Sequence, residues 1–186
     1  MKKIPSVFVR DMETKLLTQE VTPGCEWVLE GEGRATKKHD GTAVMIGDRF
    51  VYKRYDAKHG KTPPPDFIPC QEPDAKSGHW PGWIMVDKDN PADKWIFEAL
   101  ENDIRLHMPG TYELCGPRIN TNREKLTEHE LIKHGSVDLP EVLICGCRTF
   151  ESIKKFLEAL TADNEGIVYH HLDGRMAKVK YRDFFR

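Results

Sequence analysis

The sequence predicts an α+β domain built mainly from antiparallel strands, and three observations lead to this class. Short alternating or apolar segments, bounded by Gly, Pro and Asp, outnumber helical patterns. Two stretches carry apolar residues at helical spacing, and both lie between expected strands. Strands and helices do not alternate regularly, as a doubly wound parallel sheet would require, so antiparallel pairing is favoured.

The expected strands are separated by turn residues. The stretch 31–55 is interpreted as a β-meander, because Asp40-Gly41 and Gly47-Asp48 supply residues that tight hairpin turns favour. A final hairpin is expected to turn at Asp173-Gly174. The expected strands cover residues 6–10, 34–39, 42–46, 49–55, 111–115, 142–145, 166–170 and 176–181.

Two helices are expected between these strands. The first begins at Asn90-Pro91, which offers an N-cap and an N1 proline, and ends at Pro109-Gly110. Its apolar residues at helical spacing are Ile96, Leu100 and Ile104. Thr149 is the expected cap of the second helix. The apolar residues of that helix repeat at i, i+3, i+4 and i+7, as Ile153, Phe156, Leu157 and Leu160.

Residues 56–90 are rich in Pro, Gly, Asp and Lys and include three consecutive prolines, at 63–65. This composition predicts a long loop. Long loops in compact domains are usually functional or mobile. We therefore expect this segment to close over a ligand.

The length of 186 residues fits one domain over residues 1–186. The net charge of −2 argues against a polycation that coats nucleic acid, so any such contact needs a local patch. The apolar runs are too short to cross a membrane, and no apolar segment follows residues 1–3 as in a signal peptide. The five cysteines are expected to be reduced thiols, and a cytoplasmic location with no membrane partner is expected.

Lys38, Asp40 and Gly41 form a KxDG motif at the end of an expected strand. A lysine amine becomes a nucleophile when cationic neighbours or desolvation favour its neutral form. Lys37 points to the opposite face of the strand, so such help must come from elsewhere. Taken alone, the motif is better explained by a lysine at the end of a strand that precedes a type I′ turn.

Lys178 and Lys180 alternate with Ala177 and Val179, so the two lysines share one face of a strand. Two lysines on one face repel each other unless they share an anion. Phosphate groups are suitable anions, because phosphoryl transfer is catalysed mainly by positioning and charge neutralisation. A solvated strand face is the alternative.

Two glutamates accompany expected strands. Glu165 precedes an apolar strand close to the lysine-bearing strand, where it could bind Mg²⁺. Glu113 alternates with Tyr112 and Leu114 and faces away from them, where it could bind a ribose hydroxyl. In isolation, Glu165 is better explained as an exposed acid at the start of a strand, and Glu113 could equally be a surface residue.

The ordered set of Lys, Glu, Glu and Lys-x-Lys, each on or beside an expected strand, resembles the covalent nucleotidyltransferase superfamily of ligases and capping enzymes. Residues 38–41, 112–116, 165–168 and 178–180 look like its motifs I, III, IV and V. Residues 78–83, 148–151 and 174–178 are similar to segments of the RNA ligase 1-like group of ATP-dependent RNA ligases. The resemblance extends from about Gly31 to the C-terminus.

The resemblance implies an antiparallel-sheet, ATP-grasp-like ligase domain with flanking helices. It implies that Lys38 attacks ATP to form lysyl-AMP, that AMP passes to the 5′-phosphate of an RNA end, and that a 3′-hydroxyl then displaces AMP. The implied substrates are therefore ATP and RNA ends, with Mg²⁺ or Mn²⁺ as cofactor. The implied nucleotide-binding residues are Lys38, Asp40, Arg54, Glu113, Glu165, Lys178 and Lys180, with Glu165 at the metal; Lys58 is second to Arg54 as the basic residue after motif I.

Two departures separate the chain from DNA ligases and capping enzymes. Many of those enzymes carry an arginine shortly after KxDG, where this chain has Thr42-Ala43-Val44. They also carry an oligonucleotide-binding (OB) domain after motif V, and none is expected before the chain ends at Arg186. DNA ligase, capping guanylyltransferase and a non-catalytic module that binds nucleotides or RNA ends stay alternatives. Candidates for the aromatic residue that stacks on adenine are Trp80, Trp83 and Phe150.

Overall fold

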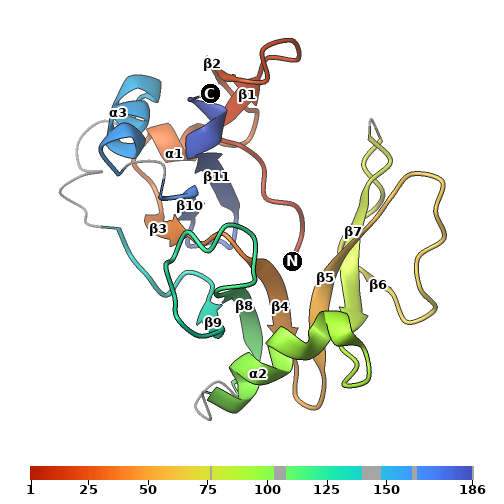
Figure 1. Cartoon of the computed structure of the whole chain (residues 1–186). Helices are drawn as coiled ribbons and strands as arrows, with labels where there is room; N and C mark the ends of the chain where they lie inside the picture. The colour runs from red at the N-terminus through yellow and green to blue at the C-terminus, as the bar shows by residue number, and fades with distance from the viewer. Residues whose placement is uncertain (76, 103–107, 140–147, 161–162, 186) are drawn as a thin grey trace. The chain divides into compact units, whose positions relative to one another are not determined.

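Strands dominate the computed structural model, which describes residues 1–75, 77–102, 108–139, 148–160 and 163–185 (Figure 1). The named strands pair antiparallel throughout the described part, in sheets of two, three and six strands. Only a few short helices accompany them. The predicted α+β class with antiparallel sheets is therefore confirmed.

The chain divides into two compact units. The first unit comprises Met1–Lys3 and Asp40–His134, and the second comprises Ile4–His39 and Gly135–Arg186. Each unit has its own cluster of buried apolar side chains. The expectation of a single domain over residues 1–186 stays a prediction.

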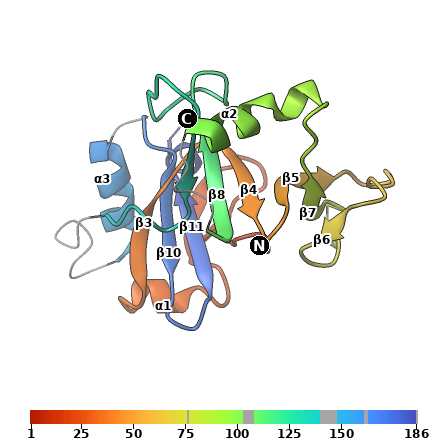
Figure 2. The same cartoon turned by 90° about the horizontal axis from the view of Figure 1, so that it is seen from below.

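The second unit is built on a sheet with strand order β11-β10-β3 (Figure 2). Its strands are β3 (Arg34–Lys38), β10 (Gly166–His170) and β11 (Met176–Lys180). One face is apolar and buried, formed by Ala35, Ile167, Tyr169, Ala177 and Val179. Because side chains alternate along a strand, the lysines at 178 and 180 lie on the other face, as predicted.

Helix α3 (Phe150–Leu160) contributes its apolar stripe to the same core. Thr149 Oγ1 accepts a hydrogen bond from the backbone N–H of Ser152 at 3.2 Å, which confirms the expected cap. The side chains predicted to face inward are indeed buried or packed at the edge of the core: Ile153, Phe156, Leu157 and Leu160. The sequence pattern therefore predicted this helix and its buried face correctly.

The N-terminal part of the second unit adds short elements to this core. They are β1 (Phe8–Arg10), β2 (Leu17–Val21) and α1 (Glu26–Leu29), and η4 (Tyr181–Asp183) follows β11. β1 confirms the strand expected over 6–10, and Ser6 makes an isolated parallel bridge with Lys178. Phe8, Trp27 and Val28 are buried in the core, which anchors these short elements.

The first unit is built on a six-stranded sheet with order β6-β7-β5-β4-β8-β9. Its strands are β4 (Thr42–Ile46), β5 (Val51–Ala57), β6 (Ile68–Pro69), β7 (Trp80–Met85), β8 (Gly110–Cys115) and β9 (Glu130–Lys133). The strands expected over 42–46, 49–55 and 111–115 are confirmed. One face of the sheet is packed by helix α2 (Lys94–Asn102), and the joint core contains Val44, Ile46, Ile96, Ala99, Tyr112, Leu114 and Leu131.

The start of α2 follows the sequence expectation. Asn90 caps η1 (Pro91–Asp93) by accepting a hydrogen bond from the backbone N–H of Ala92 at 3.0 Å, and α2 continues from there. Asp93 is fully buried, where it pairs with Lys53 and accepts a hydrogen bond from the backbone N–H of Asp87. The buried charge is thereby compensated.

The β-meander expected over 31–55 is wrong in its first half. β3 pairs with β10, whereas β4 pairs with β5 and β8. Gly41 is not among the glycines with positive φ, so the Asp40-Gly41 step cannot form the type I′ turn that would return β3 onto β4. Turn-forming residues were present, but long-range pairing decided the topology.

The long loop expected over 56–90 is also wrong in part. β7 pairs with β5 over six residues, and β6 pairs with β7. Pro81 and Gly82 obscured β7 in the sequence, because both residues are unfavourable inside strands. Gly82 has a packing reason, since a Cβ there would lie 2.2 Å from the ring of Phe67.

The last hairpin turns at Asp173-Gly174, as predicted. Gly174 has φ +90°, a conformation that favours glycine. The backbone N–H of Arg175 donates to Asp173 at 2.9 Å, and with the Arg175 and His171 side chains it lowers the pKa of Asp173 to about 2. Gly174 therefore supplies the backbone conformation of the turn, and Asp173 supplies a hydrogen-bond acceptor.

Some expectations concern residues outside the described ranges. These are the strand at 142–145, Ile104 and the pair Cys145 and Cys147. Among the described cysteines, Cys25, Cys70 and Cys115 form no disulfide bond. In the described residues, no helix has the length and apolar character needed to cross a membrane.

We predict that Leu157→Ala lowers the free energy of unfolding by about 2–5 kcal/mol, because Leu157 is fully buried and truncation leaves a cavity. The neighbouring Glu158 is exposed, so Glu158→Ala should change the free energy of unfolding by less than about 0.5 kcal/mol. Urea denaturation followed by circular dichroism measures both. Equal stability of the two variants would contradict the assigned core.

Candidate functional site

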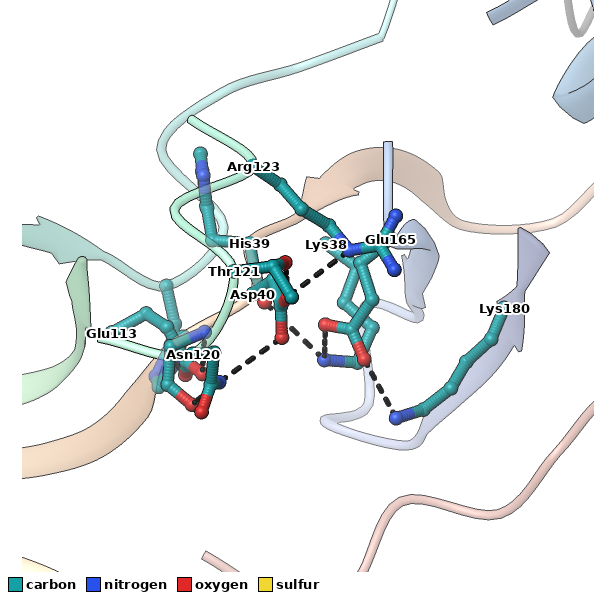
Figure 3. Close-up of polar contacts among 11 residues, drawn as sticks. Lys38, His39, Asp40, Glu113, Asn120, Thr121, Arg123, Glu165 and Lys180 are labelled. Atoms are coloured by element: carbon teal, nitrogen blue, oxygen red, sulfur yellow. Dashed lines mark hydrogen bonds and ion pairs between the residues drawn. The ribbon is translucent and has the colours of Figure 1, made fainter. Parts of the chain in front are cut away.

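A carboxylate lies between two lysines on the polar face of the second unit's sheet (Figure 3). Glu165 Oε2 accepts from Lys38 Nζ at 2.5 Å, and its Oε1 accepts from Lys180 Nζ at 2.7 Å. The three side chains are only 10–18% exposed. The structure therefore brings together three residues that the sequence predicted from separate motifs.

Strand register explains this arrangement. Gly166 pairs with Lys38 on β3 and with Lys180 on β11, so the three residues form one cross-strand row. Directly opposite residues of antiparallel strands point to the same face. Because Gly166 has no side chain, the space between the two lysines is open to the carboxylate of Glu165.

Gly166 cannot be replaced without disturbing the sheet. A Cβ at this position would lie 2.0 Å from the carbonyl oxygen of Val179. The close approach of the two backbones therefore requires glycine. In the expected motif, Gly166 is thus required by backbone packing, whereas Glu165 contributes the charge.

Lys178 lies one row further along the same face. Its register partner on β10 is Val168, which also pairs with Thr36 on β3. The backbone of Lys178 donates to Pro5 O and accepts from Val7 N, both at 2.9 Å. Lys178 thus shares the face of Lys180, as predicted, and its backbone is fixed on the outer side of β11.

Asp40 in the first unit is engaged by a loop. Its carboxylate accepts hydrogen bonds from Asn120 Nδ2 at 3.1 Å, Thr121 Oγ1 at 3.0 Å and Arg123 Nε at 3.0 Å (Figure 3). Asp40 was predicted to bind nucleotide. That call stays a prediction, and the described contacts of Asp40 show that it also anchors residues 116–126.

That loop contains three non-glycine residues in the left-handed region, Asn120 (φ 47°), Asn122 (φ 47°) and Lys125 (φ 54°). Such conformations are unfavourable and persist where surrounding contacts stabilise them. The hydrogen bonds to Asp40 supply such contacts. Asn122 adds its own, because its side chain bonds both the N–H and the carbonyl of Leu126.

Glu113 is oriented by two donors in the first unit. The backbone N–H of Gly41 donates to its Oε1 at 3.1 Å, and His134 Nε2 lies 2.7 Å from its Oε2. A Cβ at Gly41 would lie 2.1 Å from the carbonyl oxygen of Leu114, so the glycine permits this approach. The side chain of Glu113 is 12% exposed and faces away from the core, as predicted.

Arg54 lies on the same face of the six-stranded sheet as Glu113. Ala43 pairs with Glu113, and Val44 pairs with Lys53. Because β4 and β5 are antiparallel, continuing their pairing by one residue places Ala43 opposite Arg54. Neighbouring strands are about 4.8 Å apart, so roughly 10 Å separates the Arg54 and Glu113 backbones. The small side chain of Ala43 lies between an acid and a guanidinium.

Arg54 itself has several partners. Nη1 donates to the carbonyl oxygen of Met1 at 2.7 Å, and Nε donates to Asp56 at 3.0 Å. The guanidinium carbon lies 5.8 Å from the centroid of the Trp83 ring. Lys58, the second candidate for this role, is exposed. Arg54 therefore lies on the face of the sheet that carries Glu113, and its role as the basic residue after motif I stays a prediction.

The three aromatic candidates differ in environment. Phe150 packs edge-on against Phe8, with ring centroids 5.1 Å apart, and so packs against the core of the second unit. Trp83 is 3% exposed and lies opposite Arg54 in the register. Trp80 is half-buried and donates its indole N–H to Gln71 O at 2.7 Å. Phe150 is therefore explained by core packing alone.

Several residues of these clusters were missed in the sequence: Asn120, Thr121, Arg123 and His134. Residues 117–126 carry turn-forming types, but their partner Asp40 lies some 80 positions away. His134 follows β9, whose alternation would have placed Ile132 and His134 on the face of Glu113. The sequence analysis did not predict β9, so it could not place His134 beside Glu113.

Comparison with models of known protein families gave no match, and comparison with curated protein sequences gave none either.

We predict that Asp40→Ala exposes the loop at 116–126, because it removes the acceptor of three donors and costs about 1–3 kcal/mol. Amide hydrogen exchange should be faster in this loop than in wild type. Asp48→Ala, at an exposed turn, is the control and should leave the loop unchanged. Unchanged exchange in Asp40→Ala would show that the loop does not depend on Asp40.

Proposed function

We propose that this chain is an ATP-dependent RNA ligase, in which Lys38 carries AMP from ATP to the 5′-phosphate of an RNA end. The expected nucleotidyltransferase fold and the use of ATP and RNA ends are parts of this proposal. The observation that carries it is the contact of Lys38 Nζ with Glu165, in a row that also contains Lys180.

A nucleophilic lysine needs a group that accepts its proton. Glu165 Oε2 is already hydrogen-bonded to Lys38 Nζ and is suited to this task. Proton transfer to the carboxylate frees the amine lone pair to attack the α-phosphorus of ATP. The nitrogen–phosphorus bond forms, the bond from the α-phosphorus to the bridging oxygen breaks, pyrophosphate leaves, and the nitrogen releases its second proton to solvent.

Two further steps complete the proposed reaction. An oxygen of the RNA 5′-phosphate attacks the α-phosphorus, and the phosphorus–nitrogen bond breaks with return of a proton to Lys38. The 3′-hydroxyl of a second RNA end then attacks the adenylated phosphate, loses its proton and expels AMP. The sum is one phosphodiester bond, AMP and pyrophosphate from one ATP.

Lys178 and Lys180 are the proposed phosphate contacts. Both lie on the polar face of β11, and Lys180 already interacts with an anion, the carboxylate of Glu165. When Glu165 accepts a proton, the negative charge beside Lys180 disappears. A phosphate oxygen is then a suitable replacement partner for the ammonium group.

The resemblance also implies Mg²⁺ or Mn²⁺. Glu165 offers hard carboxylate oxygens, and one carboxylate together with substrate phosphates is a donor set that Mg²⁺ commonly accepts. Before Glu165 accepts the proton of Lys38, each of its carboxylate oxygens keeps a lone pair beyond its lysine contact, so the ionised residue fits this role. When bound, the ion would neutralise phosphate charge.

Glu113 and Arg54 are the proposed contacts of the nucleoside part. They share one face of the sheet with Ala43 between them, and the small side chain leaves room for a ligand. Glu113 supplies acceptors for ribose hydroxyls, and Arg54 supplies guanidinium donors near the ring of Trp83. An apolar floor with a few polar groups is typical of small-ligand sites.

We predict that the wild-type chain incubated with ATP and Mg²⁺ gains the mass of one AMP, because Lys38 forms a phosphoramidate. Lys38→Ala should gain none. Lys37→Ala is the matched control, since Lys37 is the neighbouring lysine on the opposite strand face, and it should keep the adduct. Intact-mass spectrometry distinguishes these results, and an adduct on Lys38→Ala would refute the assignment.

We predict that Glu165→Gln slows formation of the adduct by about 100-fold, the scale expected when a general base is lost. The amide keeps the size of the side chain but accepts no proton at neutral pH. The exposed Glu158→Gln serves as control. A titration of Mg²⁺ should shift to higher concentration in Glu165→Gln alone. An unchanged rate and an unchanged titration would remove Glu165 from the mechanism.

A further inference from the structure

His134 lies just beyond β9, on the face of the six-stranded sheet that carries Glu113. The register pairs Glu113 with Ile132, and His134 follows two residues later, so both side chains point to that face. The backbone N–H of His134 donates to Thr111 O at 3.0 Å. The backbone pairing at this point therefore does not need the imidazole.

The imidazole contacts the carboxylate of Glu113 directly. His134 Nε2 lies 2.7 Å from Oε2, while Oε1 accepts the N–H of Gly41 at 3.1 Å. Since an ionised carboxylate only accepts hydrogen bonds, Nε2 must carry the hydrogen. His134 Nδ1 is buried and has no hydrogen-bond partner among the described residues. Among the described residues, the imidazole of His134 therefore makes its polar contact with Glu113.

Each carboxylate oxygen of Glu113 can accept a second hydrogen bond. With one donor on each oxygen, the plane of the carboxylate is fixed and its free lone pairs have defined directions. A carboxylate oriented in this way is preorganised for a ligand hydroxyl. Losing His134 would leave Gly41 as the single described donor and allow the group to rotate.

We propose that His134 is a positioning residue that orients Glu113 to accept a ribose hydroxyl of the nucleotide, and that it thereby selects nucleotides that carry this hydroxyl over those that lack it. This inference rests on the proposed function. Glu113 makes the contact, and His134 acts through it. The hydroxyl concerned is the 2′- or 3′-hydroxyl, and the experiment separates them.

The test measures AMP adduct formation with ATP, 2′-deoxyATP and 3′-deoxyATP. His134→Ala should raise the KM for ATP about tenfold, the size expected for one misplaced hydrogen bond to a charged group, with kcat changed less than twofold. With the deoxynucleotide that lacks the relevant hydroxyl, the same substitution should change KM less than twofold. The exposed Glu158→Ala is the control.

Two conservative variants separate positioning from structure. His134→Gln can present an N–H near the position of Nε2 and should restore the KM for ATP to within about threefold of wild type. His134→Asn presents its N–H near Nδ1 and should behave like His134→Ala. These comparisons remain informative if the alanine variant fails to fold.

An equal loss with all three nucleotides would assign His134 a structural role and overturn the inference. Wild-type KM values in both His134→Ala and His134→Asn would also overturn it. A wild-type protein without any adduct would refute the proposed function instead. Equilibrium binding of the same three nucleotides then decides the inference, with the same expected ratios.

Discussion

The antiparallel register of β3, β10 and β11 determines where the charges of the second unit lie. It places Lys38 and Lys180 on either side of Gly166, and the missing side chain leaves space for the carboxylate of Glu165. Without that carboxylate, two ammonium groups would face each other in a partly desolvated position, which is costly. The buried face of the same strands fixes the register, because a slip of one residue would turn the lysines into the core.

The KxDG motif combines two structural roles. Lys38 ends β3 in the second unit, while Asp40 and Gly41 open the first unit. Asp40 anchors a strained loop, and Gly41 approaches Leu114 closely enough to donate its N–H to Glu113. Its lysine thus belongs to the charged row of the second unit, while its acid and glycine make their contacts in the first unit. This division explains why a structural interpretation of the motif competed with the chemical one in the sequence.

Local patterns predicted the elements whose causes are local. The cap at Thr149, the apolar stripe of α3 and the alternation at Lys178 and Lys180 depend on neighbouring residues, and all were predicted correctly. Pairing partners depend on distant residues, so the meander and the loop over 56–90 were predicted wrongly. The site followed the same division: Lys38 and Glu165 were found from motifs, whereas His134 required knowledge of an unpredicted strand.

Delivery of AMP from Lys38 to RNA is the step that defines the proposed ligase. Adenylated protein, freed of ATP, should be mixed with a 5′-phosphorylated RNA strand that has a free 3′-hydroxyl, and with DNA of the same sequence. The account predicts loss of AMP from the protein and joined RNA in a single turnover, with little DNA product. Retention of AMP on the protein in the presence of RNA, or transfer to DNA alone, would contradict it.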